Sequence, residues 1–316
     1  MEARNLGTSG LRVSVVGLGC NNFGGRIGLE ESRAVVHKAL DLGITLFDTA
    51  DTYGNRGGSE DALGALLGER RKDIVLATKF GLPMDDAHAL AGASRRYIMT
   101  AVEASLRRLR TDWIDLYQLH TPDDLTPIEE TLRALDDLIR QGKVRYVGNS
   151  NFAAWQAVAA HWSARHHSLN RFVSCQNEYS LIKRDIEAEL VPAMQACGLG
   201  LLPYFPLASG LLSGKYRRQA PPPPGTRLAR MTGLAERYLT PANWTIVERL
   251  ENFCAPRGHG LLELAFSWLA ARPGIASVIA GATKPEQVRA NAAAGRWTPS
   301  ESDLAALSDV LSAHAV

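Results

Sequence analysis

The stretch TLFDTADTYGNRGGSEDALGALLGERRKDIVLAT, residues 45–78, contains one full copy of the pattern that decides the fold. A short apolar run at 45–48 is followed by a segment with helical spacing at 59–67 and by a second apolar run at 74–78. Two strands joined by a helical crossover pair in parallel, because the helix returns the chain to the same end of the sheet. We therefore predict a parallel strand–helix–strand unit here.

The same alternation recurs at intervals of about 30 residues along the chain. Apolar β-branched runs predict strands at residues 14–18, 45–48, 74–78, 114–119, 144–148, 172–176, 200–204 and 276–280. Helical spacing predicts helices at residues 30–41, 59–67, 94–110, 127–141, 152–165, 185–196, 241–255, 261–271, 285–294 and 301–313. Parallel strands with helical crossovers form either an open doubly wound sheet or a closed barrel.

Eight predicted strands favour the closed form, an α/β fold of the (β/α)8 TIM-barrel type. Such a barrel uses about 250 residues. The remainder of the chain fits an N-terminal β-hairpin around Thr8-Ser9-Gly10, a long loop after strand 7 and an extra C-terminal helix. The loop includes APPPPG at 220–225, which cannot be helical. Since no break in composition divides the chain, we expect one domain over residues 1–316.

The composition describes an ordinary globular chain of 316 residues with 46% hydrophobic and 22% charged residues. Thirty-five Lys and Arg against 33 Asp and Glu leave a net charge of +2, which favours neither nucleic acid nor a membrane surface as partner. Four cysteines without CxxC spacing predict a reducing, cytoplasmic setting. The start MEARNLGTSG lacks a secretion signal and no window has 18 uninterrupted apolar residues, so we expect neither export nor membrane insertion.

Ionisable residues follow three of the predicted strands. Asp48 ends one strand and Tyr53 comes shortly after it, Lys79 follows the next strand and His120 the one after that. In an α/β barrel the reacting groups stand at the C-terminal ends of strands, so these four should converge on one rim. Each alone has a structural interpretation: an Asp48–Lys79 ion pair, a packed Tyr53, or a His120 that satisfies a strand end. Only the combination favours catalysis.

The four side chains together suit proton donation to a carbonyl oxygen. A phenol with a pKa near 10 needs help to release its proton at neutral pH. The ammonium of Lys79 would stabilise the phenolate of Tyr53, Asp48 would keep the lysine charged, and His120 would orient the carbonyl. A hydride must come from a cofactor, because no side chain donates one. A nicotinamide cofactor is therefore expected.

Two glycine motifs for nucleotide binding are incomplete in this sequence, and a histidine motif for metal binding is absent. Gly17-Leu18-Gly19 begins a dinucleotide fingerprint, but Asn22 stands at the third glycine position. Gly214-Lys215 is followed by Tyr216 rather than Ser or Thr, so it is not a P-loop. No strand carries the HxH pattern of a barrel metallohydrolase. We expect neither a Rossmann site nor a metal site.

Seven blocks of the sequence resemble the aldo-keto reductase family in order and spacing, over nearly the whole chain. They are FDTADTYG (47–54), ATKFG (77–81), DWIDLYQLH (112–120), GNSNF (148–152), QNEYSL (176–181), YFPLASGLLSGKY (204–216) and AGATKPEQVRAN (280–291). In their residues these blocks resemble bacterial and potassium-channel-β-type members more closely than mammalian aldose reductases. The resemblance implies an oxidoreductase with Asp48, Tyr53, Lys79 and His120 as its catalytic residues and Tyr53 as proton donor.

The resemblance also implies binding residues. For the nicotinamide carboxamide these are Ser150, Asn151 and Gln176, with Tyr204 stacked on the ring. The residues implied around the pyrophosphate and ribose are Pro206, Leu207, Ser209, Gly210, Leu211 and Lys215. At the adenosine end they are Gly281, Thr283, Lys284, Gln287 and Asn291. We add Gly19, Cys20, Asn21 and Asp48 to the cofactor set, and Phe23, Tyr53, Phe80, His120 and Thr121 to the substrate side; Phe23 could equally be core.

Lys284 makes NADPH (NADP+) the expected cofactor and NADH the less favoured one, because a basic group at a helix N-terminus suits a 2′-phosphate. Ala282, where some branches carry a phosphate-binding serine, weakens this preference. The segment Thr283-Lys284-Pro285-Glu286 also reads as a capping box with proline in the first turn, which needs no ligand.

The sequence as a whole predicts reduction of small aldehydes or ketones to alcohols. The alternative is a cofactor-binding regulatory subunit of the channel-β type with little turnover, and a third interpretation is a metal-dependent barrel lyase or hydrolase. The physiological substrate, the direction of the reaction and the choice between monomer and homo-oligomer stay open.

Overall fold

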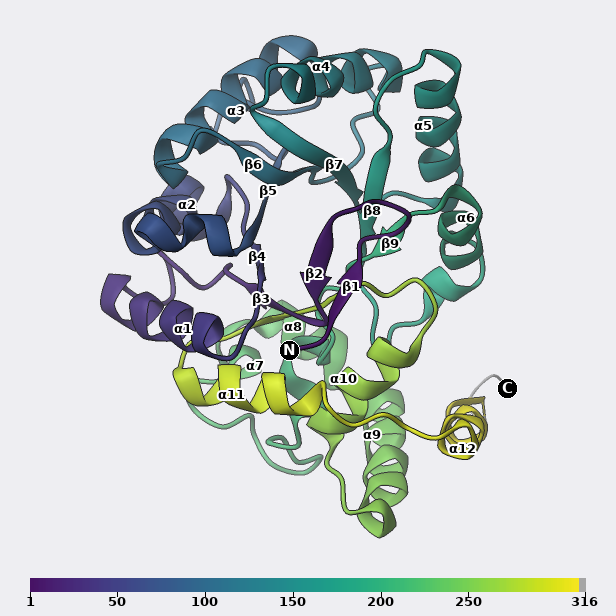
Figure 1. The fold of residues 1–316 in the computed structure, drawn as a ribbon. Helices are drawn as coiled ribbons and strands as arrows, with labels where there is room; N and C mark the ends of the chain where they lie inside the picture. The colour runs from purple at the N-terminus through teal and green to yellow at the C-terminus, as the bar shows by residue number, and fades with distance from the viewer. Residues whose placement is uncertain (313–316) are drawn as a thin grey trace.

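The computed structural model describes residues 1–312, and a parallel sheet lies at their centre (Figure 1). Its strands are β3 (Val16–Gly19), β4 (Leu46–Asp48), β5 (Val75–Phe80), β6 (Ile114–Leu119), β7 (Val144–Ser150), β8 (Phe172–Gln176), β9 (Gly200–Leu201) and β10 (Val278–Gly281). Their order in the sheet is β10-β3-β4-β5-β6-β7-β8-β9. Leu201 pairs in parallel with Ile275, and the Ile279 N–H donates to the Pro203 carbonyl at 3.2 Å. The two ends of the order therefore meet, and the predicted (β/α)8 barrel is confirmed.

Helices surround the strands, as Figure 1 shows. They are α1 (Leu29–Asp41), α2 (Tyr53–Leu67), α3 (Arg95–Leu109), α4 (Ile128–Arg140), α5 (Ala154–His166), α6 (Leu190–Cys197), α9 (Pro241–Cys254), α10 (Leu261–Ala271), α11 (Pro285–Ala294) and α12 (Glu301–Ser312). Short 3-10 helices lie at η1 (Gly68–Asp73), η2 (Asp185–Glu187) and η4 (Ala255–Arg257). In α4, Leu132, Leu135 and Leu138 are buried at helical spacing, which fixes the face that packs on the sheet. Among the described residues no helix is both long and apolar enough to cross a membrane.

Most helix predictions agree with the structure within two residues. The expected helix at 185–196 is instead divided into η2 and α6, because Pro192 fits the first turn of a helix but not its interior. The expected C-terminal helix at 301–313 is α12, and Ala313 lies outside the described residues. The regular part of α2 follows a left-handed turn at 54–57 that lies inside its assigned bounds.

The N-terminal hairpin consists of β1 (Ala3–Asn5) and β2 (Arg12–Ser14), paired antiparallel. Leu6 and Val13 are fully buried and belong to a cluster of barrel-interior side chains. The Thr8 N–H donates to the Gly198 carbonyl, just before β9 begins. The hairpin therefore closes the barrel at the N-terminal ends of its strands, and it lies across the ring of strands in Figure 1.

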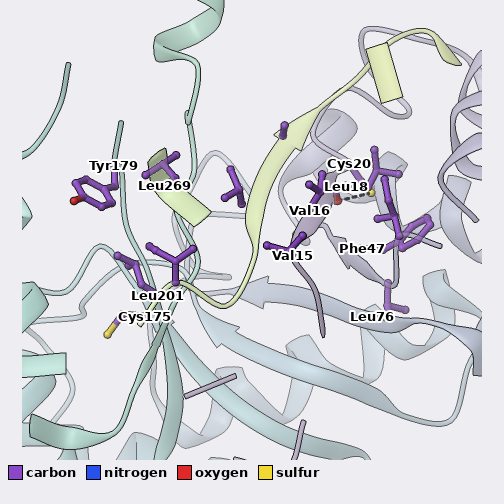
Figure 2. Close-up of a cluster of buried hydrophobic side chains, with 14 of the residues drawn as sticks. Val15, Val16, Leu18, Cys20, Phe47, Leu76, Cys175, Tyr179, Leu201 and Leu269 are labelled. Carbon is purple, nitrogen blue, oxygen red and sulfur yellow. Dashed lines mark hydrogen bonds between the residues drawn. The ribbon is translucent and has the colours of Figure 1, made fainter. Parts of the chain in front are cut away.

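Side chains along each strand alternate between the interior and the surrounding helices. Leu46, Ala77 and Leu116 lie in the interior cluster, whereas Phe47 and Leu76 pack in the outer layer, where Figure 2 labels them. Continuing the alternation places Asp48, Lys79 and Gln118 in the interior at the C-terminal ends of their strands. The interior of the barrel is therefore apolar toward the N-terminal ends of the strands and polar at their C-terminal ends.

The segment after β9 is more structured than expected. The predicted strand at 200–204 ends at Leu201, although Tyr204 makes an isolated bridge with Glu178. The expected loop contains η3 (Ala208–Ser213), α7 (Arg227–Arg230) and α8 (Thr232–Tyr238). Elements of four to seven residues span too few turns to produce a clear apolar period, and the proline run at 220–225 hid them further.

Candidate active site

A buried ion pair stands at the C-terminal ends of the strands. Lys79 Nζ donates to Asp48 Oδ2 at 2.7 Å and to the Thr49 carbonyl at 2.8 Å, and the lysine side chain is fully buried. Asp48 Oδ1 accepts from the amides of Gln118 at 3.2 Å and Gln176 at 2.8 Å. These hydrogen bonds offset part of the cost of removing two charges from water. Gln118 was not predicted as a site residue, although it lies two residues before His120 on the same face of β6.

Tyr53 lies above this pair. Its hydroxyl is 3.5 Å from Lys79 Nζ, and its ring meets the His120 ring edge-on with centroids 5.7 Å apart. Asp48, Tyr53, Lys79 and His120 therefore converge at the ends of neighbouring strands, as the sequence predicts. The arrangement places a phenol between a charged ammonium and an imidazole.

The environment fixes the protonation of these groups. Burial raises the pKa of Tyr53, and the charge of Lys79 acts against that rise. Burial lowers the pKa of Lys79, but the carboxylate of Asp48 and the hydroxyl of Tyr53 outweigh burial and leave it raised. Burial and then Lys79 lower the pKa of His120 to about 3. At neutral pH the site therefore holds a neutral phenol, an ammonium and a neutral imidazole.

A cavity of about 610 Å³ runs from Tyr53 and His120 across the strand ends to α11. The predicted residues that line it are Gly19, Asn21, Asp48, Tyr53, His120, Ser150, Asn151, Gln176, Tyr204, Pro206, Leu207, Ser209, Gly210, Lys215, Gly281, Thr283, Gln287 and Asn291. Lys79 lies beneath this surface and touches the cavity only through its partners. Most of the predicted site thus falls on one continuous wall.

Hydrogen bonds join the residues expected at the nicotinamide. The Tyr204 hydroxyl donates to Asn151 Oδ1 at 2.8 Å, and Asn151 Nδ2 donates to the His120 carbonyl at 2.9 Å. Ser150 Oγ donates to the Gln176 carbonyl at 2.8 Å. The ends of β6, β7 and β8 are therefore linked to the aromatic ring of Tyr204.

Four predicted residues are buried away from the cavity. Cys20 packs beside Leu18 and Phe47 in the outer layer (Figure 2), and its thiol points to the Leu18 carbonyl. Phe80 is fully buried and stacks on Tyr117 at 4.6 Å, because the residue after inward-facing Lys79 must face outward. Neither the thiol of Cys20 nor the ring of Phe80 therefore lines the cavity, contrary to the expected orientation of these side chains.

The side chains of Phe23 and Leu211 do not line the cavity either. Phe23 is fully buried, so the core interpretation of this residue is the right one. Leu211 is 1% exposed inside η3 and packs in the same outer core. These apolar side chains pack in the core next to the residues that line the cavity, and so stabilise the backbone of the cavity wall.

Thr121 and Lys284 do not line the cavity either. Thr121 is half-buried just after His120. Lys284 is exposed at the N-cap of α11, while its neighbours Thr283 and Gln287 face the cavity. The capping-box interpretation is also wrong in detail, because the Thr283 N–H donates to Gln287 Oε1 at 2.7 Å rather than to Glu286.

Two arginines that the sequence analysis missed, Arg26 and Arg227, line the cavity with Lys215. In the described part of the chain none of the three has a carboxylate partner; Arg26 donates to the Gly225 carbonyl and Arg227 lies over the ring of Phe205. Burial lowers the pKa of each; nearby positive charge lowers it further, from Arg230 for Arg26, from Arg26 and Arg227 for Lys215, and from Arg26 for Arg227. Arg26 and Arg227 both lie in segments that the sequence predicts to be loops, and no motif there indicates a binding residue. The remaining unpredicted lining residues are Asn22, Phe205, Ser213, Leu262, Ile279, Ala280 and Ala290.

The donor set fits a dinucleotide with a nicotinamide ring. Three cations on one wall suit a pyrophosphate or another polyanion, and the buried hydroxyl of Ser209 has no partner among the described residues. Amide and hydroxyl groups of Ser150, Asn151 and Gln176 suit a carboxamide, which offers both donors and an acceptor.

Comparisons with known proteins agree with this chemistry. The model of the Aldo/keto reductase family matches residues 15–312. A protein of Bacillus subtilis (strain 168) named uncharacterized oxidoreductase YrpG is 38% identical over 299 residues, 92% of this chain and 89% of the relative. A probable voltage-gated potassium channel subunit beta of Oryza sativa subsp. japonica is 37% identical over 300 residues, 92% and 90% of the two chains. L-glyceraldehyde 3-phosphate reductase of Escherichia coli (strain K12) is 34% identical over 302 residues, 92% and 86%.

Proposed function

The chain belongs to the aldo/keto reductase family of oxidoreductases, which use nicotinamide cofactors, and from that premise we propose that it reduces an aldehyde or ketone to an alcohol with NADPH. The observation that carries the proposal is the hydroxyl of Tyr53 at 3.5 Å from the ammonium of Lys79, at one end of the cavity. A neutral phenol beside a permanent positive charge is a general acid ready to protonate an alkoxide.

Each of the four residues has one task in this proposal. Neutral His120 donates a hydrogen bond that orients the carbonyl oxygen, and Tyr53 transfers its hydroxyl proton to that oxygen as the C–H bond forms. Lys79 stabilises the phenolate left behind, and Asp48 keeps Lys79 charged. A nicotinamide cofactor held by Ser150, Asn151 and Gln176 would supply the hydride for the carbonyl carbon and would be oxidised in exchange.

The proposed cofactor contacts follow the cavity wall. Ser150, Asn151 and Gln176 would hold the carboxamide and Tyr204 would lie against the ring. The preference for NADPH now has its main support in Arg26, Lys215 and Arg227, because three cations exceed the two charges of a pyrophosphate. Lys284, exposed at the start of α11, is the weaker candidate for the 2′-phosphate.

The test is the fall of NADPH absorbance with a panel of small aldehydes, glyoxals, aromatic ketones and a hydroxyaldehyde phosphate, the class named for the Escherichia coli relative. Tyr53→Phe should lower kcat by about 10² to 10⁴, the range for loss of a general acid, and leave the Kd of NADPH nearly unchanged. Turnover in Tyr53→Phe equal to that of the wild type would refute the mechanism.

A second candidate is a regulatory subunit that binds the cofactor and turns over slowly. The similarity to the rice channel subunit beta favours it. NADPH that quenches protein fluorescence on binding, but is oxidised by no carbonyl in the panel, would favour this candidate over the reductase.

A further inference from the structure

Tyr53 is carried by a turn with an unusual backbone. Gly54, Asn55, Arg56 and Gly57 have φ values of 68°, 61°, 66° and 121°, all in the left-handed region. Two of these residues carry a Cβ, for which this region is unfavourable. Conformations of this kind persist only when the surrounding structure holds them. The position of Tyr53 therefore depends on whatever fixes residues 54–57.

Arg108 on α3 lies against this turn from outside the cavity. A Cβ on Gly57 would be 2.7 Å from Arg108 Cδ, so the arginine stem packs directly on the glycine. The Arg108 guanidinium donates to Glu60 Oε2 through Nε at 2.7 Å and pairs with the same oxygen through Nη2 at 2.7 Å. One side chain thus contacts the end of the turn and the first regular turn of α2.

Glu60 extends this contact to the strand that carries Lys79. It is fully buried, and Glu60 Oε1 accepts from the hydroxyl of Thr78 at 2.6 Å. Thr78 precedes Lys79 on β5, with its side chain on the opposite face of the strand. The chain of contacts runs from Arg108 through Glu60 and Thr78 to β5, so it links the turn of Tyr53 to the strand of Lys79.

We propose that Arg108 is a positioning residue for proton transfer: with Glu60 it fixes the turn at 54–57 and so sets the separation of Tyr53 Oη and Lys79 Nζ. This inference rests on the proposed reductase function. Arg108 does not line the cavity, and it acts only through the backbone that carries Tyr53.

The charge of Arg108 also acts on a second buried acid, Asp51. Asp51 is 1% exposed, and its two carboxylate oxygens have no hydrogen-bond partner among the described residues. Removing the guanidinium would take away the ion-pair partner of buried Glu60, which weakens the fold. Arg108→Lys is therefore needed beside Arg108→Ala, because it keeps the charge but not the planar group that spans Gly57 and Glu60.

The experiment compares Arg108→Ala and Arg108→Lys with Arg107→Ala, an exposed neighbour on α3 that serves as the matched control. Hydrogen–deuterium exchange of residues 52–58 reports the turn without requiring activity. For both Arg108 variants we expect faster exchange in this segment, a Kd of NADPH close to that of the wild type, and kcat lowered about 10²-fold, the cost of misplacing a reacting group by about 1 Å. Methylguanidine should restore part of the lost kcat in Arg108→Ala, and Arg107→Ala should match the wild type throughout.

Each possible result either supports or overturns the positioning role of Arg108. Unchanged exchange at 52–58 in a folded Arg108 variant overturns the proposal. Faster exchange with unchanged kcat also overturns it, because Arg108 then only stabilises the fold. If the wild type reduces no carbonyl in the panel, the proposed function fails, while faster exchange at 52–58 in the Arg108 variants alone still supports Arg108 as the residue that holds the turn of Tyr53.

Discussion

Lys79 keeps its charge in a fully buried position because every direction of its ammonium meets an oxygen: the carboxylate of Asp48, the carbonyl of Thr49 and the hydroxyl of Tyr53. The same charge disfavours a proton on His120. The charge of Lys79 therefore acts on the protonation of both Tyr53 and His120.

The first prediction is that ionisation of His120 does not contribute to the pH dependence of kcat/KM. Because its pKa lies near 3 in the folded protein, the imidazole stays neutral from pH 5 to 8. We expect kcat/KM to show no ionisation of His120 in that interval, so profiles of the wild type and of His120→Asn should have the same shape at different heights. An ionisation near pH 6 that disappears in His120→Asn would contradict this prediction.

The second prediction concerns Asp51. Burial and the neighbouring Glu60 raise the pKa of its carboxyl from 3.8 to about 8. Between these two pH values the folded protein keeps a proton that the unfolded chain has lost, so this group makes stability fall as pH rises from about 4 to about 8. Asp51→Asn removes that dependence.

Urea unfolding of both proteins between pH 5 and 8 checks the second prediction. The free energy of unfolding of Asp51→Asn should gain on the wild type by up to about 1.4 kcal/mol per pH unit. Parallel stability curves over this interval would mean that Asp51 is ionised in the folded state.

At the residue scale, strand alternation explains both what the sequence predicted and what it missed. Asp48 and Lys79 lie at the C-terminal ends of their strands as predicted, because strand alternation places both side chains in the barrel interior. The ring of Phe80 faces away from the cavity although its neighbour Lys79 faces inward, because the resemblance places a residue near a site without fixing the direction of its side chain. The side chain of Cys20 likewise lies in the outer core with Phe47 and does not line the cavity.

At the scale of the elements, periodicity was a reliable guide only where elements are long. The strands at 114–119 and 172–176 and the helices at 261–271 and 285–294 have the predicted bounds, since each spans several repeats of its own period. The helices α7 and α8 and the left-handed turn at 54–57 were missed, because tertiary contacts decide such short segments.

The third prediction belongs to the hairpin formed by β1 and β2. Leu6 is fully buried among the interior side chains of the barrel, so Leu6→Ala leaves a cavity there. We expect the free energy of unfolding to fall by about 2–5 kcal/mol. The hairpin closes the barrel end opposite the candidate site, so the Kd of NADPH should stay unchanged when measured well below the unfolding transition. A weaker Kd in the folded variant would show that the two ends are coupled.

At the scale of the whole molecule, closure of the barrel creates the part of the site that the sequence could not reveal. Arg26 follows β3, whereas Lys215 and Arg227 follow β9, and only the barrel brings these distant segments to one wall. Each cation alone resembles an ordinary surface residue. Their significance comes from lining one cavity together without carboxylate partners among the described residues, which no linear pattern encodes.

The last prediction uses that wall to test the cofactor. Arg227→Met should raise the Kd of NADPH about tenfold to a hundredfold, as expected for the loss of a charge-assisted hydrogen bond of about 1.5–3 kcal/mol. The increase should shrink at high salt, because screening already weakens the contact in the wild type. Arg230→Met is the matched control, since Arg230 lies on the same short helix α7 but is exposed and does not line the cavity. Fluorescence titration with NADPH and NADH measures both variants. Equal losses of NADPH affinity in the two variants would assign the effect to the overall charge of the protein. A loss of affinity that is confined to Arg227→Met, and is larger for NADPH than for NADH, would place the additional phosphate of NADPH at this wall of the barrel.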